Sequence, residues 1–142
     1  MTYPNPRSAV KQYTAVGAQS AITGADPFRL VQMLMDGALD KIAIAKGHME
    51  RNETAEKGRH ISWAISIING LRMSLNPEAG GDIAENLDRL YEYMERRLLA
   101  ANIENNVAYL DEVADLMGQI RSAWVEISDQ QATLQQTAVA TG

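Results

Sequence analysis

The most apolar stretch of the chain, residues 25–46 (ADPFRLVQMLMDGALDKIAIAK), constrains the fold more than any other. Asp26 can cap a helix, because its carboxylate accepts hydrogen bonds from the free backbone amides of the first turn. Pro27 can begin the helix, because the backbone N–H that proline lacks has no hydrogen-bond partner at that position. One broad apolar face, spaced by three and four residues, consists of Val31, Leu34, Met35, Ala38, Ile42, Ala45 and Met49. A second flank beside it consists of Leu30, Met33, Gly37 and Ile44. The pattern predicts a helix over about 26–49 that packs on two sides.

Two further helices follow. The second is predicted over about 54–75, with one face formed by Ile61, Ala64, Ile68, Leu71 and Leu75 and an adjoining flank formed by Trp63 and Ile67. The sequence NPEAGGD at 76–82 then predicts a loop, because Asn tolerates a left-handed cap and Pro cannot continue a helix. Asp82 is the predicted cap of the third helix. Its single apolar stripe consists of Ile83, Leu87, Leu90, Tyr91, Met94, Leu98 and Ala101.

A fourth helix is predicted after a turn at 102–106. Its apolar side consists of Leu110, Val113, Leu116, Met117, Ile120, Trp124 and Ile127, whereas Val107, Ala114 and Val125 lie off that stripe. Residues 1–24 predict an arm, either with a short helix around 8–13 or as a frayed end, because termini are ordered only where something ties them down. Residues 130–142 are uncharged and rich in Gln, Thr and Ala, which predicts a polar, disordered tail.

These patterns predict an all-α fold, an antiparallel up-down-up-down four-helix bundle with an N-terminal arm or short helix. Four helices of about 20 residues, each about 30 Å long and joined by short turns, run antiparallel to their chain neighbours. The predicted organisation is an arm over 1–24, the bundle over 25–129 and the tail over 130–142. Because the first two helices are both two-sided, their spare flanks are predicted to form one groove.

Composition narrows the class of protein. The chain has 142 residues, which suits one domain, and no cysteine, so neither disulfides nor thiolate metal sites are available and a reducing, cytoplasmic location is expected. The first residues, MTYPNPRSAVKQY, lack the apolar core of a secretion signal, and no apolar run is long enough to insert into a membrane. A formal net charge of −5 opposes binding to nucleic acid.

Residues with catalytic or metal-binding potential are few. The chain has two histidines, His48 and His60, and neither lies in the Glu-x-x-His spacing of a di-iron bundle. Glu56 and His60 are one helical turn apart, a spacing that can hold a metal but that we interpret as a solvent-exposed pair. No nucleophile or phosphate-binding motif is present. We therefore expect a protein that is not an enzyme, with no cofactor and no metal.

The positive signal is excess apolar surface. The chain has seven methionines, and Met33 lies on the spare flank of the first helix, where a flexible thioether side chain can repack around a bound peptide. The same flank also suits self-association, so a structural or regulatory helical module that forms a homodimer is the alternative hypothesis.

Three motifs resemble one known family. ADPFRLVQMLMDGAL at 25–39, NLDRLYEYMERRL at 86–98 and the Ala123–Trp124 pair within IRSAWVEI are similar, in order and spacing, to the flagellar secretion chaperone family, FliS. The resemblance covers about residues 13–128. Met35 departs from it, since family members commonly carry Tyr there, so a hydrogen bond from that hydroxyl is not carried over.

The resemblance implies a cytosolic, non-enzymatic chaperone that binds the disordered C-terminal segment of flagellin, prevents its premature polymerisation and helps deliver it to a membrane protein of the type III export gate. The candidate client-binding residues are Leu30, Met33, Gly37, Ile44, Trp63, Ile67, Val107, Ala114 and Val125. Tyrosines in the arm of family members are linked to export-gate contact, a role that the resemblance gives to Tyr13 and Tyr3.

Overall fold

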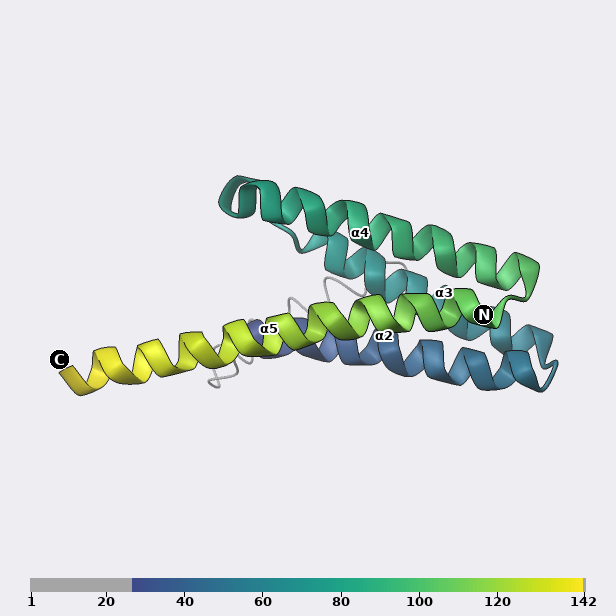
Figure 1. The fold of residues 1–142 in the computed structure, drawn as a ribbon, viewed down its shortest axis with the longest axis horizontal. Helices are drawn as coiled ribbons and strands as arrows, with labels where there is room; N and C mark the ends of the chain where they lie inside the picture. The colour runs from purple at the N-terminus through teal and green to yellow at the C-terminus, as the bar shows by residue number, and fades with distance from the viewer. Residues whose placement is uncertain (1–26, 142) are drawn as a thin grey trace.

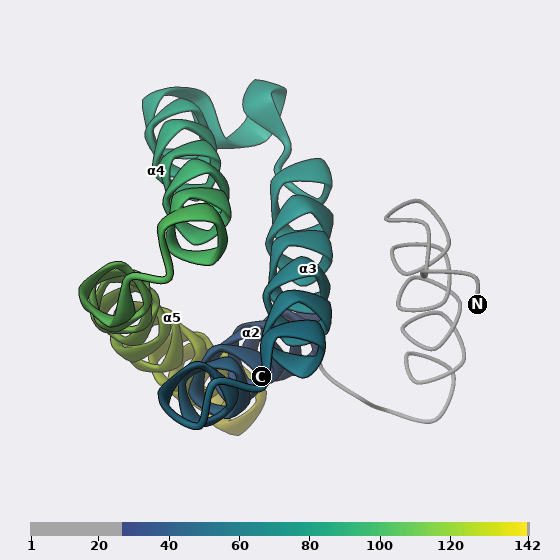
Figure 2. The same ribbon diagram turned by 90° about the vertical axis from the view of Figure 1, so that its right-hand side faces the viewer.

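The computed structural model describes residues 27–141, which form four helices. They are α2 (Pro27–Glu50), α3 (Thr54–Met73), α4 (Pro77–Glu104) and α5 (Val107–Thr141). Helix α2 packs against α3 and α5, and α4 packs against the same two helices, so the four form a ring when viewed along the bundle (Figure 2). No strand occurs in the described part of the chain. The predicted all-α antiparallel bundle is confirmed, and Figure 1 shows its up-down-up-down course.

Asparagines mark three of the helix boundaries. Asn52 in the α2–α3 turn and Asn105 after α4 have positive φ angles of 59° and 54°, a conformation that Asn tolerates. Asn76 caps α4, because its Oδ1 accepts from the backbone amides of Glu78 at 3.1 Å and Ala79 at 3.3 Å. The prediction of a loop over 76–82 with a cap at Asp82 was therefore wrong.

The error has a local cause at Gly81. Helix α4 begins at Pro77, as a proline at the first helical position allows, and is then interrupted at Gly81, whose φ is 53° and ψ is −129°. Glycine adopts this left-handed conformation without steric cost. The sequence NPEAGGD thus encodes a short helical turn and a kink instead of an irregular loop.

The core follows the predicted stripes. Fully buried side chains from all four helices form one cluster, which includes Met35, Ile42, Ile61, Ile68, Leu71, Met94, Leu98, Leu110, Val113 and Met117. Two predicted stripe residues lie outside it, since Ile83 is 72% exposed and Ile127 is 45% exposed. Both lie where α4 begins and α5 leaves the bundle, so helical spacing continues there without a partner to cover it.

The C-terminal end of the chain differs from the prediction, and the N-terminal arm lies outside the described residues. The tail predicted to be disordered from residue 130 is instead helical, because α5 continues to Thr141. Neither Pro nor Gly interrupts the sequence between Gly118 and Gly142, so no residue there breaks a helix. The predicted arm, with Tyr3 and Tyr13, falls outside the described residues. Within the described residues, no helix is both long and apolar enough to cross a bilayer.

Candidate functional site

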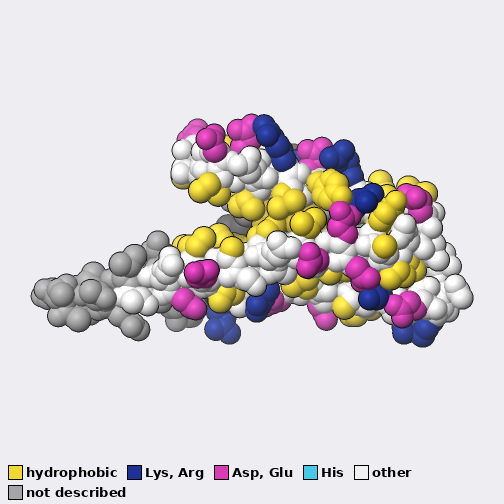
Figure 3. Space-filling model, in the orientation of Figure 1, with side chains coloured by type: hydrophobic (Ala, Val, Ile, Leu, Met, Phe, Trp, Pro, Cys, Tyr) yellow, Lys and Arg dark blue, Asp and Glu magenta, His cyan; other side chains and the backbone are white. Residues whose placement is uncertain are grey.

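Helices α4 and α5 diverge from the turn that joins them (Figure 1). Figure 3 shows a hollow between them, with hydrophobic side chains along both sides. We call this hollow the α4–α5 groove. By helical spacing we assign to this groove the partly buried Leu87 and Leu90 of α4 and Leu116 and Ile120 of α5, with the exposed Ile83 and Ile127 at its rim. The groove therefore borders the buried core, against which its partly buried residues pack.

Polar contacts around Glu112, which we call the polar lock, join α4 to α5 near the turn between them. Glu112 of α5 accepts from the Tyr93 hydroxyl at 2.7 Å and from Arg97 Nε at 2.6 Å, and the Arg97 guanidinium lies 3.8 Å from the centre of the Tyr109 ring. The Tyr93 hydrogen bond, followed by that of Arg97, lowers the pKa of Glu112. Residues Leu116 and Ile120 follow Glu112 on the same side of α5 at helical spacing, so the groove begins where this lock ends.

The opposite side of α5 is anchored to α2. Trp124 donates from Nε1 to the backbone carbonyl of Phe28 at 2.8 Å, and the two rings lie 5.1 Å apart. Arg121 pairs with Asp36, and Lys46 pairs with Asp111 at 2.9 Å. These contacts run along α2 and leave the α4 side of α5 open. Helix α5 is thus a fixed wall of the groove.

The predicted groove between α2 and α3 is instead a closed seam. A Cβ atom added at Gly37 would lie 3.6 Å from Ile67 Cδ1, which is ordinary packing contact, and Ile67 is only 8% exposed. The expectation that Ile67 lies on a free flank was wrong, because α2 covers it. Met33 and Trp63 remain 49% and 43% exposed, and the Lys41 ammonium lies 3.9 Å over the Trp63 ring.

The remaining client-binding candidates are half-buried: Leu30, Ile44, Val107, Ala114 and Val125. Val107 and Ala114 pack against the core. Helical spacing places them on the side of α5 that carries Asp111 and Arg121, and therefore toward α2. The structure thus divides the predicted set between the α2–α3 seam and the α2 side of α5. It does not join them into one surface.

Comparison with known proteins now decides the family. The family model described as flagellar protein FliS matches residues 9–131. This chain belongs to the FliS family. The flagellar secretion chaperone FliSB of Pseudomonas aeruginosa is 49% identical over 120 residues, covering 84% of this chain and 95% of the relative. The flagellar secretion chaperone FliS of Salmonella typhimurium is 43% identical, covering 85% of this chain and 90% of the relative. That of Bacillus subtilis is 33% identical, covering 79% of this chain and 82% of the relative.

The three motifs that resemble FliS meet in this structure. Trp124 docks on Phe28, in the first turn of α2, and the motif at 86–98 supplies Leu87 and Leu90 to the groove. Met35, the departure from the FliS pattern, is only 1% exposed, so at this position a thioether fills the core. Sequence reasoning missed the groove because Leu87, Leu90 and Ile120 belong to stripes typical of core residues. Only the divergence of α4 from α5 uncovers them.

Proposed function

We propose that this FliS-family protein is a flagellar export chaperone that acts in the cytoplasm and holds the disordered C-terminal segment of flagellin in the α4–α5 groove. The observation that carries this proposal is the hollow between α4 and α5, which has apolar side chains along both sides, together with the exposure of Ile83 and Ile127. An unfolded client segment buries apolar side chains there, which keeps it from polymerising with other flagellin chains. Exposed Met33 and Trp63 supply a second contact along the α2–α3 seam.

Coupled folding explains how such a surface both holds and releases its client. A disordered segment that forms an amphipathic helix places its i, i+3, i+4 and i+7 side chains in an apolar groove. Ordering that segment consumes about 2–5 kcal/mol of the contact energy. The net affinity is therefore moderate for the area buried, so release at the export gate is attainable. We extend the proposal to the arm, whose Tyr13 and Tyr3 contact the export-gate protein.

Calorimetric titration with the C-terminal segment of flagellin tests the client assignment. We expect one-to-one binding with a negative heat-capacity change, since apolar surface is buried, and a gain in helix content measured by circular dichroism. The absence of both heat and helix gain, from a protein shown to be folded, contradicts the proposal. Light scattering then tests the alternative: a constitutive dimer that never binds flagellin favours the self-associating module.

A matched pair of variants on α4 tests the groove itself. Ile83 and Ile103 are 72% and 74% exposed, but Ile83 lies on the groove rim and Ile103 lies near the turn to α5, where the polar lock closes the helices together. We expect Ile83→Glu to weaken client binding about tenfold, because a carboxylate is poorly solvated in an apolar interface, and Ile103→Glu to leave binding unchanged. Equal effects from both variants, or loss of binding only in Met33→Glu, would move the client away from this groove.

A further inference from the structure

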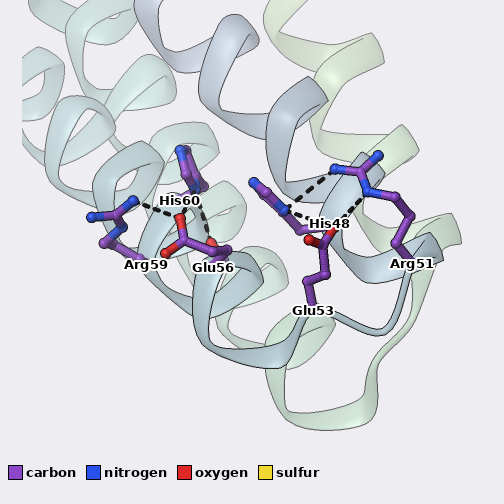
Figure 4. Close-up of polar contacts among 6 residues, drawn as sticks. All are labelled: His48, Arg51, Glu53, Glu56, Arg59 and His60. Carbon is purple, nitrogen blue, oxygen red and sulfur yellow. Dashed lines mark hydrogen bonds and ion pairs between the residues drawn. The ribbon is translucent and has the colours of Figure 1, made fainter.

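A polar cluster at the α2–α3 turn brings together both histidines of the chain (Figure 4). His48 lies in the last turn of α2, and His60 and Glu56 lie one turn apart in the first half of α3. The ring centroids of His48 and His60 are 5.1 Å apart. One possible ligand atom from each of His48, Glu56 and His60 lies within 4.8 Å of the other two. The turn at residues 51–53 folds α3 back beside α2, which a linear motif does not reveal.

Both imidazoles are oriented by hydrogen bonds at Nδ1. His60 Nδ1 lies 2.8 Å from the backbone carbonyl oxygen of Glu56, which can only accept, so Nδ1 carries the proton and Nε2 keeps a lone pair. His48 Nδ1 lies 3.2 Å from Glu53 Oε1 and 3.3 Å from Arg51 Nη2. Metal binding at His48 Nε2 requires the tautomer in which Nδ1 donates to Glu53. Metal-binding histidines are typically held by such carbonyl and carboxylate partners.

We propose that His48, Glu56 and His60 bind a zinc ion. Two imidazoles and one carboxylate are a donor set that suits zinc, with a water molecule completing a tetrahedron. Two imidazoles that share a tetrahedral zinc, with Zn–N bonds of about 2.0 Å, place their ring centroids about 5 Å apart, which agrees with the 5.1 Å found here. His60 is only 8% exposed, so part of the site is already removed from water.

Zinc binding must displace existing contacts. Arg59 pairs with Glu56 Oε2 at 2.5 Å, and Arg51 lies 3.3 Å from His48 Nδ1 and 2.5 Å from Glu53 Oε1. Glu56 Oε2 also lies 3.9 Å from His60 Nδ1, not on the Nε2 side of the ring. The ion therefore replaces the Arg59 guanidinium on Glu56, and the Glu56 side chain rotates toward His60 Nε2 to complete the site. A bound zinc then joins the end of α2 to the start of α3, so it stabilises the folded over the unfolded chain in proportion to its concentration.

Thermal unfolding of the tag-free, full-length protein with increasing zinc chloride tests the site. We expect the midpoint to rise with zinc and to be unchanged by magnesium or calcium, which prefer oxygen ligands. Glu56→Gln and His48→Gln should abolish the rise. Glu50→Gln makes the same chemical change at the exposed end of α2 and should retain it. Glu53→Gln should weaken zinc binding about tenfold, because His48 loses its orienting carboxylate.

Nuclear magnetic resonance of the imidazole groups provides a second readout that does not depend on stability. With only two histidines in the chain, zinc should shift the signals of both in the wild type and of neither in Glu56→Gln. Circular dichroism establishes that each variant is folded. An unchanged midpoint in the wild type, or a rise of equal size in Glu56→Gln and Glu50→Gln, would overturn the proposal.

Discussion

Two helix pairs in the bundle have similar sequence patterns but pack differently. Along the α2–α3 seam, Gly37 lets α2 approach Ile67 within packing distance, and the seam is closed from the turn onward. Between α4 and α5, the lock around Glu112 holds only the end near the turn, and the helices then separate. An amphipathic stripe therefore specifies which residues seek burial, whereas the angle between helices decides whether they obtain it.

Paired leucine truncations give the largest expected contrast between the two regions. Leu34 of α2 is 8% exposed, and Leu34→Ala should lower the free energy of unfolding by about 3 kcal/mol, since it leaves a cavity in the closed core. Leu87 of the groove is only partly buried, so Leu87→Ala should lower it by about 1 kcal/mol. Urea unfolding measures both. A loss at Leu87 as large as that at Leu34 would mean that the groove is closed in solution.

A smaller effect is expected where α5 is anchored to α2. Trp124→Phe keeps an aromatic ring beside Phe28 but removes the Nε1 hydrogen bond to its carbonyl. We expect a loss of about 1 kcal/mol in the free energy of unfolding, the usual net contribution of one such bond. Unchanged stability would show that the anchor is supplied by the ion pairs of Arg121 and Lys46.

The smallest effect concerns pH and the lock at the closed end of the groove. The hydrogen bonds from Tyr93 and Arg97 hold the pKa of Glu112 below its ordinary value of 4.5. A carboxyl with a lowered pKa stabilises the folded state above its unfolded pKa, and this contribution is lost as the pH falls through the folded pKa. The wild type should therefore be more stable than Glu112→Gln at about pH 7, and the difference should shrink as the pH falls through the lowered pKa of Glu112. A difference that persists in acid would contradict this role.

Much of the bundle could be predicted because its rules are local. The three- and four-residue spacing of Leu34, Ala38 and Ile42 predicted the buried face of α2, and Pro27 predicted its start. The same reasoning found Ile68 and Leu71 on α3 and the short turns that make neighbours antiparallel. These features depend only on residues within one or two helical turns of each other.

What could not be predicted depends on distant residues. Spacing places Ile67 on a flank of α3, but whether α2 covers that flank depends on how closely Gly37 approaches it. Similarly, Ile83 has the spacing of a core residue but is 72% exposed. His48 lies beside Glu56 and His60 because of the fold of the α2–α3 turn, and the spacing of Glu56 and His60 alone does not reveal this proximity.

The buried Lys57 limits how helix α4 can move relative to α3. Its ammonium donates to the Asn102 carbonyl and to Asn105 Oδ1, both at 3.1 Å, and so fixes the end of α4 to the start of α3. The uninterrupted part of α4, which follows the kink at Gly81, extends about 35 Å from this contact. Arg72 of α3 pairs with Asp88 at 3.0 Å and with Glu95 at 2.9 Å nearer the other end of α4. Because α4 is tied to α3 at both ends, the α4–α5 groove can widen only if α3 and α4 move together away from α5.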